Sequence, residues 1–94
     1  MDAIELEFFR LKFRIRVLER LVLKLAMQAL RSTRDLSVQA ARRELEGYLR
    51  AAETEALSVY GEHFRDPAQV ALYADEISEM VDSLVQLVDE IARE

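Results

Sequence analysis

The first thirty residues carry apolar side chains on two opposite sides of a helix, and this constrains the fold more than any other feature. At about 100° per residue, one stripe has spacings that alternate between four and three residues: Ile4, Phe8, Leu11, Ile15, Leu18, Val22, Leu25 and Ala29. Other apolar residues project from roughly the opposite side: Leu6, Phe9, Phe13, Val17 and Met27. A helix that packs on one layer needs only one such stripe. We therefore expect this helix to be sandwiched, with a second copy of the chain covering one side.

Length and composition favour a single all-helical domain. The chain has 94 residues, of which 51% are hydrophobic, and only two glycines and one proline. So few turn-forming residues are typical of a few long helices joined by short connections. There is no cysteine, which excludes disulfides, thiolate zinc sites and a thiol nucleophile.

The periodicity divides the chain into three helices, at about residues 2–31, 35–60 and 67–93. Short connections make sequential helices antiparallel, so we expect an up-down-up bundle that assembles into a homo-oligomer. The apolar stripe that begins at Ile4 would then form part of the core.

Residues that favour helix ends stand at both boundaries. The first boundary contains possible N-caps, namely Ser32, Thr33 and Asp35. At the second, Gly61 is expected to end a helix in the left-handed conformation. Asp66 followed by Pro67 is a typical N-cap and first helical residue.

One segment fits a second interpretation. Residues 9–17 alternate strictly between apolar and basic residues, which is the period of a strand. In a strand, one face would carry Arg10, Lys12, Arg14 and Arg16. That pattern resembles ribbon-helix-helix proteins, whose paired strands enter the major groove of DNA. The resemblance implies a nucleic-acid-binding regulator that uses the basic segment 10–24.

The charge changes sign along the chain. Residues 1–34 carry a net charge of +4, residues 35–65 carry −2, and residues 66–94 carry −7. A basic first helix and an acidic third helix can face each other, within one chain or between two. Because the acidic third repels phosphates, we expect no tight binding to duplex DNA.

No set of residues forms a catalytic, cofactor-binding or metal-binding signature. The single histidine, His63, lacks partners for base catalysis or metal ligation, and we interpret it as a structural or loop residue. A small helical enzyme remains an alternative, because the first helix offers cations that could bind an anionic substrate, among them Arg10, Arg14, Arg16, Arg20 and Lys24. In architecture the chain resembles the all-helical chorismate mutases, which bind a dicarboxylate. That family has a short middle helix, whereas the middle helix here is long.

The sequence thus predicts a non-enzymatic, cytoplasmic module that binds itself and another protein, such as a small adaptor, a chaperone-like protein or a regulatory subunit. It predicts no cofactor, metal, small-molecule substrate, nucleic acid or membrane insertion. The interface candidates are the apolar residues opposite the expected core stripe: Leu6, Phe9, Phe13 and Val17.

Overall fold

Three long helices make up the chain, which we describe for residues 2–94 from a computed structural model: α1 (Ala3–Arg34), α2 (Val38–Gly61) and α3 (Pro67–Ala92). These residues contain no strand. The all-helical prediction is therefore confirmed, and residues 9–17 are helical. Helix α1 runs three residues further than its predicted end at Arg31.

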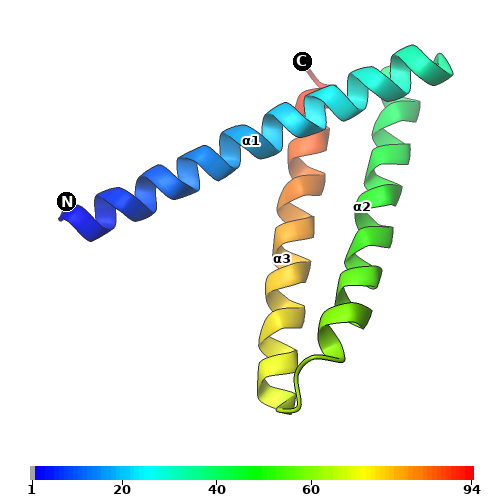
Figure 1. The fold of residues 1–94 in the computed structure, drawn as a ribbon. Coiled ribbons are helices and arrows are strands. Elements are labelled where there is room, and N and C mark those ends of the chain that lie inside the picture. The colour runs from blue at the N-terminus through cyan, green and yellow to red at the C-terminus, as the bar shows by residue number, and fades with distance from the viewer. Residues whose placement is uncertain (1) are drawn as a thin grey trace.

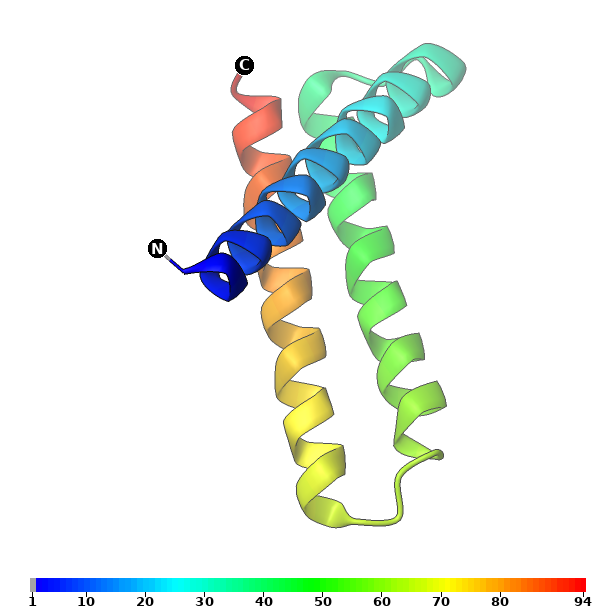
Figure 2. The same cartoon turned by 60° about the vertical axis from the view of Figure 1, so that its left-hand side comes forward.

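Helices α2 and α3 pack side by side as an antiparallel hairpin, and α1 crosses its open end at a steep angle (Figures 1 and 2). The N-terminal half of α1 extends beyond the hairpin (Figure 1). The molecule is accordingly broad and flat, with principal extents of 45 × 38 × 17 Å. An up-down-up bundle requires three helices that run alongside one another. Within this single chain α1 instead crosses the other two helices.

The core lies where α1 crosses the hairpin. Leu23 and Met27 of α1 are each 5% exposed, and they pack against buried residues of both hairpin helices: Ala41, Leu45, Leu87, Val88 and Ile91. Ala41 and Val88 have no exposed surface. Small side chains at these positions allow the helices to approach closely, so α1 docks where the hairpin helices themselves contribute fully buried residues.

Polar side chains cap each helix at its N-terminus. Asp2 and Glu5 form a capping box, in which the backbone N–H of Glu5 donates to the Asp2 carboxylate at 2.8 Å. Ser37 accepts from the backbone N–H of Ala40 at 3.2 Å. Asp66 accepts from Ala68 at 2.9 Å, directly before Pro67. The predicted cap at Asp66 is confirmed, whereas the cap of α2 is Ser37 rather than an earlier residue.

The left-handed residue is Asp35 and not Gly61. Asp35 ends α1 with φ 51° and ψ 43°, and neither glycine has a positive φ. Aspartate tolerates this conformation better than most residues because its short polar side chain can bond locally. The sharp change of direction after α1 therefore takes place at a residue with a Cβ, where some strain is retained.

Ion pairs join the hairpin along its length. Arg42 of α2 contacts Asp89 of α3 and Glu46 of its own helix, both at 3.1 Å. Arg50 contacts Asp82 of α3 at 2.8 Å. The acidic helix α3 is thus matched chiefly by cations of α2, while Arg20 and Lys24 of α1 contact Glu94, which lies just beyond the C-terminal end of α3.

Two carboxyl groups lie beside Arg42 and perturb each other. A hydrogen bond with Asp89, helped by burial, raises the pKa of Glu46 above its ordinary value. The same bond and the Arg42 guanidinium lower the pKa of Asp89. Glu46 therefore favours the folded state in its protonated form, and this contribution is lost as the pH rises through its folded pKa. Asp89 contributes in its ionised form, and that contribution is lost as the pH falls through its folded pKa.

We expect Glu46→Gln to raise the melting temperature at pH 7, because it removes a carboxylate that faces Asp89. The gain stays below about 1 kcal/mol because both groups are partly exposed. It should disappear below about pH 4, where a carboxyl at this position is protonated in both states. Thermal unfolding across pH measures this, with Glu55→Gln on the exposed side of α2 as the control. A loss of stability at pH 7 would show that the pair with Arg42 outweighs the repulsion.

Replacing Asp35 by glycine is expected to stabilise the fold by about 0.5–1 kcal/mol, because glycine adopts positive φ without a Cβ clash. Thr33→Gly, two residues earlier and inside α1, should instead destabilise by a similar amount. Urea unfolding of the two variants would compare them. If both lose stability equally, the left-handed conformation at Asp35 is not strained.

Candidate protein-interaction surface

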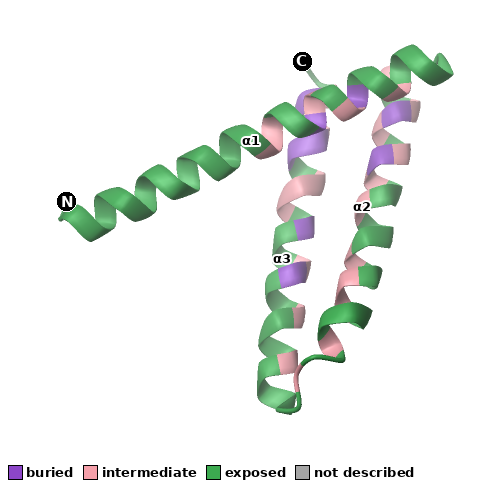
Figure 3. Cartoon of the chain, viewed as in Figure 1, coloured by how far each residue is buried: buried purple, intermediate pink, exposed green. Residues whose placement is uncertain are grey.

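The N-terminal part of α1 is an uncovered apolar helix. Every residue from Asp2 to Leu18 is exposed, and Figure 3 shows this part of α1 without buried positions. Its exposed large hydrophobic side chains include Phe8 at 61% and Phe13 at 63%. Contiguous apolar surface of this kind marks interaction sites on soluble proteins.

The apolar stripe that was expected to form the core is not covered. All eight of its residues are exposed in the single chain, and we call them the α1 seam: Ile4, Phe8, Leu11, Ile15, Leu18, Val22, Leu25 and Ala29. Even where α1 crosses the hairpin, Val22 is 61% and Leu25 65% exposed, while Leu23 between them is 5% exposed. The prediction that the hairpin covers this stripe is therefore wrong.

A different face of α1 packs on the hairpin. It consists of Leu23, Met27, Leu30 and Ala26, about 120° around the helix from the α1 seam at 100° per residue. Two cations continue this face toward the N-terminus, since Arg16 donates to the Ser83 hydroxyl at 2.7 Å and Arg20 pairs with Glu94. The chain thus uses only the last third of α1 for apolar docking and leaves the seam open.

The predicted interface residues form a second exposed strip, which we call the α1 strip: Leu6, Phe9, Phe13 and Val17. The strip lies on the side of α1 opposite the seam, at roughly 160–200° around the helix axis. Both predicted stripes are therefore accessible, which is more apolar surface than the sequence pattern alone suggested.

The cations of α1 do not gather into one site. Lys12 and Arg16 lie about 160° around the helix from Arg10 and Arg14, because residues that alternate in sequence scatter on a helix. The helical conformation of residues 9–17 also removes the paired strands that a ribbon-helix-helix protein needs. Lys24 contacts Glu94 at 3.2 Å, so it faces a carboxylate of its own chain.

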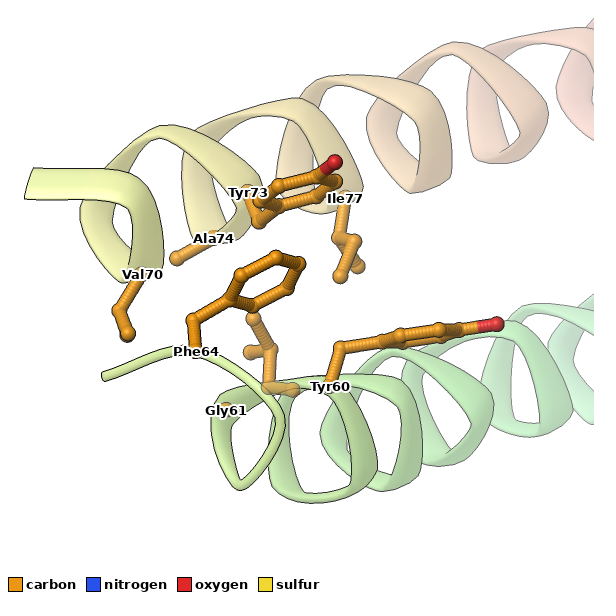
Figure 4. A pocket seen from close by; sticks show the side chains of 8 residues that line it. Tyr60, Gly61, Phe64, Val70, Tyr73, Ala74 and Ile77 are labelled. Carbon is orange, nitrogen blue, oxygen red and sulfur yellow. The ribbon is translucent and has the colours of Figure 1, made fainter. Parts of the chain in front are cut away.

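A small hollow lies between α2 and α3 beside the turn that joins them (Figure 4), at the end of the hairpin opposite α1 (Figure 1). Phe64 stacks on Tyr73 with ring centroids 4.3 Å apart, and the lining of the hollow also includes Leu57 and Ile77. Its free volume is about 20 Å³, close to the space of one water molecule. Such a hollow reflects aromatic packing that closes the hairpin.

His63 lies exposed in the turn after α2, with its ring edge-on to Tyr60 at 6.5 Å. Among residues 2–94 no three His, Asp or Glu side chains come together in a way that could hold a metal ion. The acidic residues of α3 instead lie along its outer side or pair with α2.

Comparisons with protein-family models, with curated protein sequences and with solved structures give no match for this chain. None of the helices in residues 2–94 combines the length and the apolar character needed to cross a bilayer.

We expect Leu23→Ala to lower the free energy of unfolding by about 2–5 kcal/mol, because it leaves a cavity where α1 docks on the hairpin. Leu72→Ala is the matched control, since Leu72 of α3 is 61% exposed, and it should change stability by less than about 0.5 kcal/mol. Denaturant unfolding followed by circular dichroism gives both values. Equal losses would contradict the docking face described here.

Proposed function

We propose that this protein is a non-enzymatic interaction module that assembles with itself through the exposed part of α1. The single observation that supports this is the uncovered apolar surface of α1, which combines the α1 seam and the α1 strip on one helix. Burial of two phenylalanines alone contributes roughly 3–6 kcal/mol before the costs of association. A partner helix that lies on this surface therefore gains a large apolar contact.

The chain consists of a packed core and an uncovered helical segment, and this arrangement supports the same function. The hairpin and the last third of α1 share one packed core, while residues 3–18 lie outside it. The packed core thus closes without residues 3–18, about half of α1, and this half is available to contact another chain. The seam and the strip lie on opposite sides, so self-association on one side leaves the other for a further protein, as in a small adaptor or a regulatory subunit.

The test is the mass of the purified protein in solution. Light scattering coupled to gel filtration at tens of micromolar is expected to give at least twice the chain mass of 10.9 kDa. Changing one pair of residues on each side of α1 to glutamate should then yield a monomer: Leu11 and Leu18 of the seam, with Phe9 and Phe13 of the strip.

Circular dichroism checks that the variant with four glutamates remains helical. We expect that it does, because none of the four altered residues takes part in the contact of Leu23 and Met27 with the hairpin. Leu72→Glu is the matched control for an apolar-to-acidic change on an exposed helix surface, and it should leave the assembly intact. An unaltered protein that stays monomeric at tens of micromolar overturns the proposal.

A further inference from the structure

We propose that the α1 seam pairs with the same seam of a second copy to form a parallel, in-register, two-stranded coiled coil. This inference rests on the proposed function, because it assigns the self-association to one side of α1 and gives it an orientation. The seam spans residues 4–29, about 39 Å of helix at 1.5 Å per residue.

The side chains of the seam match the preferences of a two-stranded coiled coil. Its alternating spacings define heptads with Phe8 and Ala29 at the outer a positions and Ile4 at the first d position. In the middle of the seam, Ile15 and Val22 occupy a positions, while Leu11, Leu18 and Leu25 occupy d positions. β-Branched residues at a with leucine at d favour two parallel strands over three or four. Three consecutive leucines at d are sufficient for a sustained apolar contact between two helices.

The hairpin leaves room for the second helix. It packs on α1 about 120° around the axis from the seam, and Val22 and Leu25 remain open beside the buried Leu23. Two chains related by a two-fold axis along the seam therefore carry their hairpins on the outside of the pair. Figure 2 shows α1 lying on one side of the hairpin rather than between its helices.

Charges beside the seam favour the parallel orientation. In a parallel pair each g residue faces the e residue that lies five positions later in the other helix. Glu7 then faces Lys12 of the second copy, and Arg14 faces Glu19. Leu21, the next g residue, faces Ala26. The two-fold symmetry repeats each pair, so four ion pairs of opposite sign flank the seam.

Antiparallel pairing is less favourable, because it sets e against e and g against g. When Ile15 lies opposite Leu11, Lys12 faces Lys12 and Arg14 faces Arg14, so like charges meet. When Ile15 lies opposite Leu18, Lys12 faces the oppositely charged Glu19. In the same register Arg14 faces the apolar side chain of Leu21 and has no carboxylate partner.

A third antiparallel register, with Phe8 opposite Leu11, does pair Glu7 with Arg14 and Glu5 with Lys12, but it overlaps only residues 4–15 and leaves the rest of the seam uncovered. Among the arrangements that cover more of the seam, only the parallel one gives Glu7 and Arg14 an oppositely charged neighbour.

Contacts within the single chain leave these groups able to pair. Glu7 lies 3.8 Å from Arg10, and Glu19 lies 3.5 Å from Arg16. Both distances are long for ion pairs between side chains of one helix, and such exposed pairs contribute little. Arg16 keeps its hydrogen bond to Ser83 when Glu19 turns to a second chain.

Exchanging charges at the e or the g positions tests the orientation without changing the net charge. The e-swap is Lys12→Glu with Glu19→Lys, and the g-swap is Glu7→Lys with Arg14→Glu. Each swap alone places like charges together in the parallel pair. An equimolar mixture of the two variants restores every opposite-charge contact between unlike chains.

We expect each swap to weaken self-association at least about tenfold in analytical ultracentrifugation at low salt. The mixture should associate as tightly as the unaltered protein. Circular dichroism confirms that each variant remains helical. Self-association that both swaps leave unchanged overturns the parallel pair, because the antiparallel register with Lys12 against Glu19 retains its charges in both variants.

A spin label gives an independent measurement, since the chain has no cysteine of its own. Labels on Ala3→Cys lie side by side in a parallel pair, and pulsed electron paramagnetic resonance should detect a single short distance. Antiparallel pairing separates the labels by at least about 20 Å along the helix axis, and by about 30 Å or more in the registers that cover most of the seam. That result would overturn the inference while the proposed self-association stands, whereas an unaltered monomer overturns both.

Discussion

Docking of the last third of α1 on the open end of the hairpin is the interaction that gives the molecule its shape. Leu23 and Met27 belong to the same buried cluster as Ala41 and Val88, the two residues of that cluster with no exposed surface. Because both hairpin residues are small, α1 can cross closely and at a steep angle. The crossing fixes the direction of the rest of α1, which then extends past the hairpin with its apolar residues uncovered.

Charge reinforces this docking without determining it. Arg20 and Lys24 both contact Glu94, on the same turns of α1 as the buried leucine. Arg34 contacts Glu44 where the chain enters α2. Partly exposed ion pairs such as these are individually weak, so they chiefly set the register of α1 on the hairpin. The acidic helix α3, meanwhile, is matched mainly by Arg42 and Arg50 of α2.

The sequence predicted the helices well, because the apolar period and the capping residues are local signals. The boundary at Asp66 and Pro67 is one example. The left-handed position was missed, since glycine is the usual choice and aspartate at residue 35 gives no distinct signal. The seam was correctly identified as an apolar stripe but assigned to the core, because periodicity shows that a face needs cover and not which chain covers it. The docking face, with Leu23, Met27 and Leu30 four and three residues apart, was detectable in sequence but short, and the longer stripe obscured it.

The extended part of α1 has a consequence for how a newly made chain behaves. Residues 3–18 have no packed apolar neighbour from the hairpin, so apart from the hydrogen bond of Arg16 to Ser83 their order in a lone chain depends on the Asp2 capping box and on intrinsic helix propensity. Helices held only by such local terms are marginal and fray readily. Resistance of this segment to proteases and to hydrogen exchange therefore increases with whatever surface covers it. A protease that cuts frayed segments would therefore cleave copies with an uncovered N-terminal part of α1 before copies in which that part is covered.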